Sequence, residues 1–532
     1  MITKAKVVVS MKEFLCSNKK FLILTSLVVL LSALTALVTP FIVQNVSDTL
    51  LISNKTFLLI FISMTLSFLL QLSAQLYREN YAANFNRQYL FQLLEKMSKL
   101  SYDTYLEAEP TYLINRIYQA VDALYLFFIN SLPEVLKTAL LLFFSVLFSS
   151  FISWKIAITL LLLIPLNYFG YKTINKELSV RMENMQQSSA VALKDLTVTL
   201  SNVDGIKSQA NEDMLYYLLE HKIEAMYVAL ANANKFAQTT SSILGFINQL
   251  SQQLIYLWTS LMIAKGELEI TNLIVLSIVL PLFFNSLSEV NRINLDFRSL
   301  NTSNQYIQNE LDDKVEKNGH LDLVGIQSIR FAKPTFMQGT KKFDFNITAT
   351  LSKNDIVYLS GPSGSGKSSL LKLLLKFRPT EGIYINNLPI NQLENRSLRQ
   401  KIAYLSQETT ILSTTLEKNI GYGNLLTPEQ KHFLIQTKLL EPILKNKNWE
   451  TMLVENGSNL SGGEKQRIAA ARLLITSADL YIMDESTSSI DEHSATAIFE
   501  TILNFKKDKI IIFTSHDKKK QQYATKIIEI GK

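Results

Sequence analysis

Cysteine is almost absent from this 532-residue chain, in which Cys16 is the single example. One cysteine excludes an internal disulfide framework and any cysteine cluster that would hold a metal. A basic patch interleaved with aromatic residues is also missing, although Lys and Arg number 53 against 46 Asp and Glu. Without such a patch, the net charge of +7 does not indicate a nucleic-acid partner.

Charge is missing from several long stretches of the N-terminal half. The chain is 48% hydrophobic, and its mean hydropathy of +0.14 is high for a soluble protein. Because a bilayer core requires about 20 mostly apolar residues per helix, these stretches predict an all-α polytopic membrane domain over residues 1–305. Its six predicted spans lie at about residues 21–43, 57–77, 131–152, 156–172, 240–264 and 270–289.

Basic residues flank these spans asymmetrically. Five precede the first span and five lie between the second and third: Lys4, Lys6, Lys12, Lys19, Lys20, Arg78, Arg87, Lys96, Lys99 and Arg116. The Lys/Arg bias of short flanks therefore places the N-terminus in the cytosol, and six spans return the chain there. We expect a multi-pass protein of the cell membrane, with a bacterial plasma membrane favoured. The basic start also resembles a signal peptide, but its apolar run exceeds the usual length of about 7 to 15 residues.

The two inner connectors contain almost no Gly or Pro. These connectors, Arg78–Tyr125 and Lys172–Lys235, carry charges of both signs and are predicted to extend the membrane helices into the cytosol. We expect turns within Glu109–Asp122 and Ser201–Gly205. Each tip is either a solvated helix hairpin or a short coupling helix that docks on a second domain.

Span five carries several polar residues but no charge. Asn248, Gln252 and Thr259 fall on one helix face. Such a stripe faces a wet cavity or forms hydrogen bonds between helices, and the sequence leaves both open.

A phosphate-binding loop lies in the C-terminal part. After a linker at residues 306–319, residues 320–532 are predicted to form an α/β domain that begins with a strand at Leu321–Phe331. A second strand, Asp355–Ser360, leads directly into the loop, and Ser369–Phe377 continues as a helix. The loop reads Gly361-Pro362-Ser363-Gly364-Ser365-Gly366-Lys367-Ser368. Its glycines allow backbone N–H groups to converge on phosphates, Lys367 meets the β and γ phosphates, and Ser368 ligates Mg²⁺.

Two later elements indicate which kind of nucleotide-binding protein this is. The strand that starts at Leu480 ends in two carboxylates, of which Asp484 can hold Mg²⁺ and Glu485 can polarise an attacking water. Ser461-Gly462-Gly463 opens a helix with Ser461 as its N-cap, which makes a second anion-binding helix start. Because the first loop already holds one nucleotide's phosphates, this second start suits the phosphates of another subunit.

Taken together, these motifs resemble an ABC transporter of the exporter type, a half-transporter with six spans and one nucleotide-binding domain in one chain. The resemblance implies an ABC-type P-loop ATPase in which Leu460–Glu464 is the signature motif, with Glu464 where Gln is usual. By the same resemblance, Gln407 touches Mg²⁺, Asp491 is the D-loop aspartate, and His516 acts with Glu485 in catalysis. Ser369 completes the residues expected at the nucleotide.

The resemblance also implies an aromatic partner for adenine, for which Phe331 is the candidate and Phe336 its rival. The expected cofactors are ATP and Mg²⁺, and the expected activity is ATP hydrolysis that drives an apolar or amphipathic peptide, lipid or drug-like compound out of the cytosol. A homodimer is chemically sufficient, and a heterodimer with a sister chain stays open. The alternatives are an importer and a membrane-bound regulatory ATPase without cargo. We expect no peptidase activity toward leader peptides.

Overall fold

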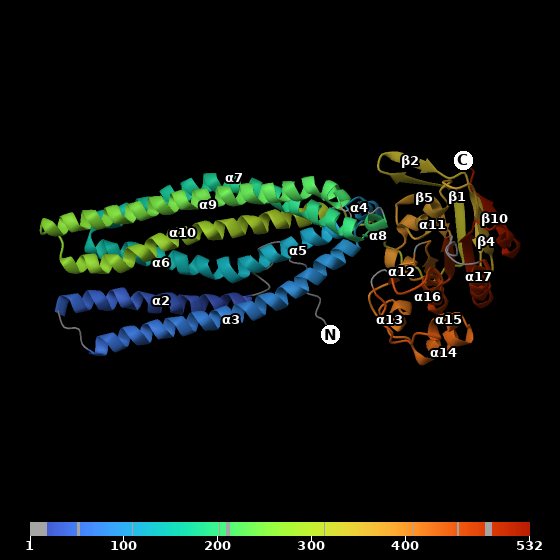
Figure 1. The fold of residues 1–532 in the computed structure, drawn as a ribbon, viewed down its shortest axis with the longest axis horizontal. Coiled ribbons are helices and arrows are strands. Elements are labelled where there is room, and N and C mark those ends of the chain that lie inside the picture. The colour runs from blue at the N-terminus through green and yellow to red at the C-terminus, as the bar shows by residue number, and fades with distance from the viewer. Residues whose placement is uncertain are drawn as a thin grey trace. The chain divides into compact units, whose positions relative to one another are not determined.

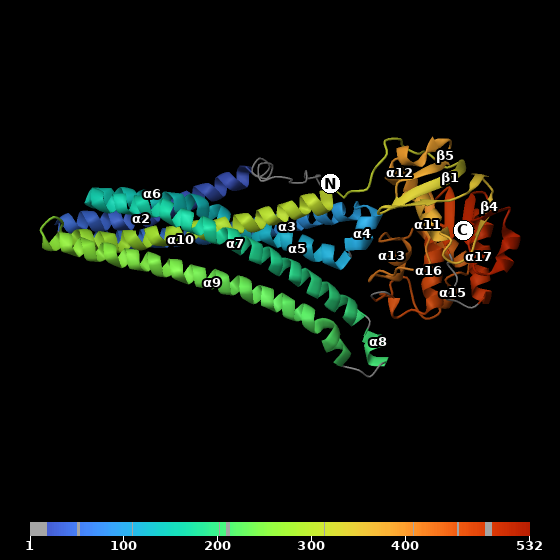
Figure 2. The same ribbon diagram turned by 90° about the horizontal axis from the view of Figure 1, so that it is seen from above.

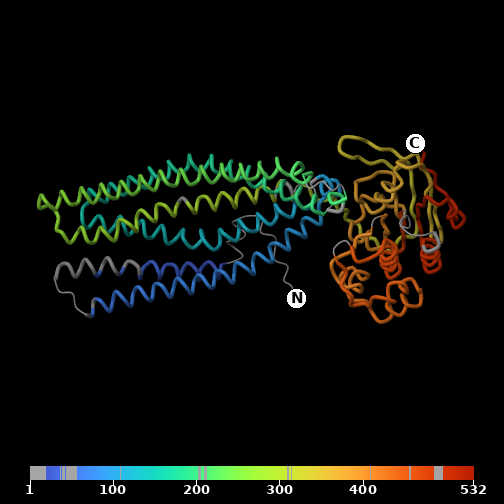
Figure 3. Tube along the Cα trace, in the orientation of Figure 1, coloured from blue at the N-terminus to red at the C-terminus, as the bar shows by residue number. Residues whose placement is uncertain are grey.

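The computed structural model describes residues 19–49, 54–108, 110–201, 203–208, 213–312, 314–407, 409–454, 457–484 and 492–531. Figure 3 traces the path of the chain, coloured by residue number. The chain divides into two compact units. The helical unit comprises residues up to Leu100 and Thr104–Val315, and the α/β unit comprises Ser101–Asp103 and Glu316–Lys532. Three residues from an early part of the sequence therefore belong to the α/β unit.

Helices make up the helical unit, and most of them are long (Figure 1). They are α2 (Lys19–Thr49), α3 (Asn54–Ser98), α4 (Tyr102–Ala108), α5 (Pro110–Leu126), the π-helix η1 (Phe127–Ser131), α6 (Leu132–Ile152), α7 (Trp154–Ser201), α8 (Val203–Ser208), α9 (Asp213–Ala264), α10 (Ile270–Tyr306) and the π-helix η2 (Ile307–Asp312). Helices α7 and α9 run side by side over much of their length in both views (Figures 1 and 2).

Four helical segments are long and apolar enough to cross a membrane, counted over the described residues: Phe57–Ser98, Pro110–Ile152, Trp154–Ser201 and Ile270–Tyr306. The first and fifth predicted spans fall on α2 and α9, helices of 31 and 52 residues. The six predicted spans therefore all lie on helices. The helices continue well past the apolar stretches, since α7 extends to Ser201.

The expected turn within Glu109–Asp122 is not found over Pro110–Asp122, and Glu109 lies outside the described residues. Residues from Pro110 onward form α5, and the face that carries Leu113, Ile117 and Val121 is buried. Proline at the first position of a helix costs no backbone hydrogen bond, so it begins this helix. The chain leaves α3 at Ser98 instead and passes through Lys99–Ser101 into α4. At the second tip α7 ends at Ser201, and the short helix α8 follows.

The polar stripe of α9 is only partly buried. Asn248 and Thr259 lie at 5% and 0% exposure, and the Thr259 hydroxyl donates to the Ile255 carbonyl of its own helix. Gln252 donates to the Tyr256 hydroxyl at 3.1 Å. Two of the three polar groups are thus satisfied within α9 itself.

Two sheets build the α/β unit. The antiparallel sheet has the order β2-β1-β5-β6 with β3 also paired to β1, and the parallel sheet has the order β10-β4-β9-β8-β7. Their strands are β1 (Ser328–Gln338), β2 (Lys341–Asp344), β3 (Thr348–Ser352), β4 (Ile356–Ser360), β5 (Thr380–Ile385), β6 (Leu388–Pro389), β7 (Ile402–Leu405), β8 (Leu480–Asp484), β9 (Ile510–Thr514) and β10 (Lys526–Glu529). The helices are α11 (Lys367–Leu374), α12 (Asn395–Arg399), α13 (Leu416–Ile420), α14 (Pro428–Gln436), α15 (Glu441–Leu444), α16 (Gly462–Ile475) and α17 (Glu492–Lys506), with 3₁₀ turns at Ile390–Gln392 and Lys518–Tyr523.

Both faces of the parallel sheet are buried, because alternate residues of each strand enter different cores. On β8, Leu480 and Ile482 join the core that includes α11, whereas Tyr481 and Met483 join the core that includes α16. Strand β9 alternates in the same way. Asp484 follows Ile482 by two residues, and Thr514 follows Ile512 by two residues, so both side chains lie on the α11 side of the sheet.

The strand predicted at Leu321–Phe331 begins later than expected, at Ser328 in β1. Before that point the backbone bonds elsewhere: Leu321 N–H donates to the Gln392 carbonyl, and Ile326 N–H donates to the Asp479 carboxylate. These partners replace a strand neighbour, so the segment is irregular.

Candidate nucleotide site

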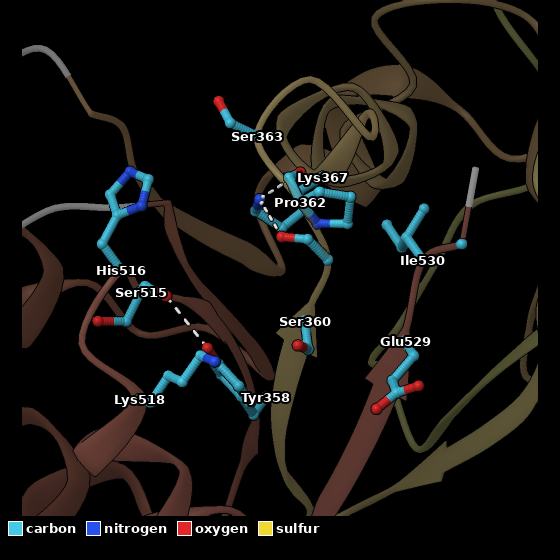
Figure 4. A pocket seen from close by; sticks show the side chains of 12 residues that line it. Tyr358, Ser360, Pro362, Ser363, Lys367, Ser515, His516, Lys518, Glu529 and Ile530 are labelled. Carbon is cyan, nitrogen blue, oxygen red and sulfur yellow. Dashed lines mark hydrogen bonds between the residues drawn. The ribbon is translucent and has the colours of Figure 1, made fainter.

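The phosphate-binding loop joins β4 to α11. Gly364 and Gly366 have φ values of +79° and +92°, a backbone region that residues other than glycine rarely adopt. A Cβ atom on Gly366 would also lie 3.0 Å from Cε1 of the Phe345 ring. Lys367 Nζ donates to the carbonyl oxygens of Gly361 and Pro362 at 2.9 and 3.1 Å, so the cation lies within the curve of the loop (Figure 4).

One carboxylate collects hydroxyl groups from three elements. Asp484 is 3% exposed, and its Oδ1 accepts hydrogen bonds from Ser368 Oγ of α11 and Thr514 Oγ1 of β9, each at 3.0 Å. The Tyr404 hydroxyl of β7 donates to Oδ2 at 3.3 Å. Burial, and then the charge of Asp484, raise the pKa of Tyr404, so this hydroxyl stays protonated.

A pocket of about 510 Å³ opens beside the loop. Gly361, Pro362, Ser363 and Lys367 line it together with His516, which follows β9 (Figure 4). The rest of its lining, which no sequence motif marks, is Tyr358, Ser360, Ser515, Lys518, Glu529, Ile530 and Gly531. Glu529, the last residue of β10, and Ile530, the residue after it, lie across the pocket from His516 (Figure 4).

The signature segment forms a capping box. Ser461 Oγ accepts from Glu464 N–H at 3.2 Å, and Glu464 Oε2 accepts from Ser461 N–H at 2.8 Å, so α16 begins at Gly462 as expected. Lys447 Nζ pairs with Glu464 Oε1 at 2.8 Å. Burial opposes the charge of Glu464, but these partners outweigh it and lower the pKa of that carboxyl. Residues 460–464 are absent from the described lining of the pocket.

Phe331 does not fit the role of an adenine partner. It is 2% exposed and packed in the core between the antiparallel sheet and α11, so neither face of its ring is accessible. Its rival Phe336 is 5% exposed and stacks on Phe343 and Phe345, at 5.2 and 6.0 Å between ring centroids. Phe343, at 42% exposure, is the aromatic side chain of this hairpin that remains accessible.

For several of the predicted site residues, the role assigned from the sequence remains a prediction. Glu485 and Asp491 lie outside the described residues. Gln407 is exposed and follows β7, whose end lies beside that of β8 because Leu405 pairs with Met483. Ser369 lies in α11 next to Ser368. No local motif marks Tyr404 and Thr514 as site residues, but strand alternation would have predicted both, since each falls on the same sheet face as Asp484.

Comparison with known proteins places both halves of the chain. Residues 22–287, half of its length, match the family model for the ABC transporter transmembrane region, and residues 345–488 match the family model described as ABC transporter. The chain therefore belongs to the ABC transporter family. Membership implies ATP binding and ATP hydrolysis coupled to transport, in a multi-pass membrane protein. The predicted fold class, a helical membrane domain followed by an α/β ATPase domain, is confirmed.

Relatives differ in how much of their length the chain spans. An ABC transporter ATP-binding/permease protein of Haemophilus influenzae is 33% identical over 40% of this chain and 39% of its own length. The lactococcin-A transport/processing ATP-binding protein of Lactococcus lactis is 26% identical over 65% of this chain and 49% of its own length. The ATP-dependent lipid A-core flippase of Desulfotalea psychrophila is 24% identical over 72% and 68%.

The fold is that of a solved exporter. A bacterial Atm1-family ABC exporter, whose structure has ATP bound, superposes with a TM-score of 0.86 over 97% of this chain and 94% of its own, at 20% identity. This likeness establishes the fold of a fused exporter chain.

Gly366→Ala should weaken ATP binding by about tenfold or more. Alanine at a positive φ costs about 1 to 2 kcal/mol, and its methyl group would meet Phe345. Gly339→Ala is the matched control, since φ there is +57° and a new Cβ would have open space around it. Equilibrium binding of a fluorescent ATP analogue measures both, and equal affinities of the two variants would contradict the role of loop geometry.

Proposed function

We propose that this chain is the half-transporter of an ATP-driven exporter, with its ATPase domain and N-terminus in the cytosol and its spans in a bacterial plasma membrane. The observation that carries the proposal is the convergence of Ser368, Lys367 and Asp484 at one edge of a parallel sheet, in a chain that also has long apolar helices. We take residues 1–305 as the membrane domain, 306–319 as the linker and 320–532 as the ATPase domain.

The donor atoms at the loop fit Mg²⁺. A hydroxyl and a carboxylate lie side by side, and hard oxygen ligands with one or two carboxylates are what Mg²⁺ takes beside nucleotide phosphates. Within the described part of the chain there is no cluster of three or more His, Cys, Asp or Glu that would form a separate metal cage. Ser368 and Asp484 would hold the ion, with Gln407 as a further ligand. The bound ion would neutralise charge on the phosphates.

The nucleotide site is completed by a second copy. The start of α16 has backbone N–H groups and a dipole suited to anions, yet residues 460–464 do not line the pocket of their own chain in its described part. Phosphates of ATP on the partner copy are therefore the target of this helix start. We favour a homodimer, because both kinds of half-site are encoded in one sequence; a heterodimer with a sister chain is the other arrangement.

Each ATP is then held between Lys367 of one copy and Ser461–Gly463 of the other. ATP drives motion because it binds the closed dimer better than the open one. Glu485 accepts a proton from the attacking water, His516 contacts the γ-phosphate, and Asp491 belongs to the interface. Hydrolysis lets the two ATPase domains separate, and the spans then return to their starting conformation.

The cargo is proposed to be apolar or amphipathic: a peptide, a lipid or a drug-like compound. What favours this class is the apolar character of the spans, together with relatives whose names specify lactococcin-A and lipid A-core. A regulatory ATPase without cargo and an importer are the remaining candidates, but no particular observation favours either.

Glu485→Gln should lower ATP turnover by about 10² to 10⁴-fold, because a general base contributes that much. Nucleotide binding should persist and the dimer should accumulate in its closed form. Glu500→Gln, which alters an exposed carboxylate bonded to Tyr523, is the control. Near-normal phosphate release by Glu485→Gln would remove Glu485 from this role.

Ser461→Arg should reduce the ATPase rate at least tenfold, because the side chain would occupy the position meant for the partner's phosphates. Thr427→Arg is matched to it, since Thr427 and Gln430 form the other capping box, at the start of α14. Each change costs the helix about 1 kcal/mol, so only the signature variant should lose activity. Equal rates for the two variants would argue against a site shared between copies.

Transport itself is tested in reconstituted vesicles. The full chain should hydrolyse ATP faster when an apolar peptide, a lipid or a dye-like compound is its cargo, and that compound should move across the bilayer only with ATP. Glu485→Gln vesicles supply the background rate. Stimulation without net movement would favour the regulatory ATPase, and ATP-dependent movement into the compartment that holds the ATPase domain would favour an importer.

A further inference from the structure

The Tyr404 hydroxyl is placed on Asp484 by strand register. Tyr404 pairs with Ile482 across the parallel β7–β8 ladder, so its side chain shares a sheet face with Asp484, two residues further along β8. A diagonal neighbour in a sheet lies about 7 to 8 Å away, within reach of a tyrosine. The ring packs against the core that includes α11, and the hydroxyl reaches Asp484 Oδ2 at 3.3 Å.

The two oxygens of this carboxylate have different partners. Oδ1 accepts from Ser368 and Thr514, whereas Oδ2 accepts from the Tyr404 hydroxyl. The terminal torsion of an aspartate is broad and roughly two-fold, so donors on both oxygens are needed to hold the carboxylate plane. Since Asp484 is 3% exposed, bulk water does not replace a donor that is lost.

We propose that Tyr404 is a positioning residue for magnesium: its hydroxyl orients the Asp484 carboxylate before the ion and the nucleotide arrive. This inference rests on the proposed role of Asp484 as a ligand of Mg²⁺. Partners that orient a metal ligand typically contribute 10 to 100-fold in affinity or activity. Because 3.3 Å is long for a hydroxyl donor, the lower end of that range applies.

The test is Tyr404→Phe in the full chain, which removes the hydroxyl and keeps the ring. Binding of a fluorescent ATP analogue is measured while Mg²⁺ is titrated, and again with the metal chelated. We expect the half-saturating Mg²⁺ concentration to rise about tenfold, and affinity in chelator to stay at the wild-type value. A merely structural role would weaken binding equally in both conditions, and that result would overturn the inference.

Tyr481→Phe is the matched control. Tyr481 belongs to β8, and its hydroxyl donates to the Thr476 carbonyl at 2.6 Å. Its side chain faces the α16 side of the sheet, away from Asp484. The Tyr481 hydroxyl also accepts from the Ala478 N–H at 3.2 Å, so the variant loses more hydrogen bonding than Tyr404→Phe does and should still keep the wild-type Mg²⁺ dependence. A shift as large as that of Tyr404→Phe would overturn the proposal.

Asp484→Asn separates failure of the inference from failure of the proposed function. If this variant raises the Mg²⁺ requirement while Tyr404→Phe does not, only the role of Tyr404 is overturned. If Asp484→Asn keeps the wild-type requirement, the magnesium assignment and the inference both fall. In the Asp484→Asn background, Tyr404→Phe should add less than a twofold shift; the full tenfold shift there would show that the hydroxyl acts elsewhere.

Discussion

A single buried carboxylate organises the nucleotide half of this molecule. Asp484 accepts hydroxyl donors from α11, β7 and β9, so the helix after the phosphate-binding loop and two strands are tied to the strand between them. A buried charge is tolerated only where hydrogen bonds compensate its lost hydration. The geometry of the loop, the register of the sheet and the candidate metal ligands are therefore parts of one arrangement.

Local sequence was sufficient for most of the ATPase half. The loop, the helix start at Ser461 and the strands that end at Ser360 and Asp484 were predicted because each is encoded by adjacent residues, with glycines, a cap or an unbroken apolar run. The adenine partner was not, because the accessibility of Phe331 depends on which layer covers β1. That layer is built from residues distant in sequence.

Chemistry that depends on pairing between strands also escaped prediction. Tyr404 and Thr514 reach Asp484 only because β7, β8 and β9 align in one register. In the helical unit, the apolar runs predicted spans that all fall on helices, whereas Pro110–Asp122, where a turn was expected, belongs to α5, because a proline is acceptable at a helix start. Composition cannot distinguish these two uses of proline, and packing of Leu113 and Ile117 decides between them.

The ion pair between Lys447 and Glu464 affects the electrostatic potential at the N-terminus of α16. An acid inside the first turn offsets the positive end of the helix dipole, and Lys447 restores the balance from a loop outside the motif. The capping box uses the N–H groups of Ser461 and Glu464, leaving those of Gly462 and Gly463 outside it. In the proposed dimer, the attraction between this helix start and the partner copy's triphosphate would therefore depend partly on Lys447, which lies outside the signature motif.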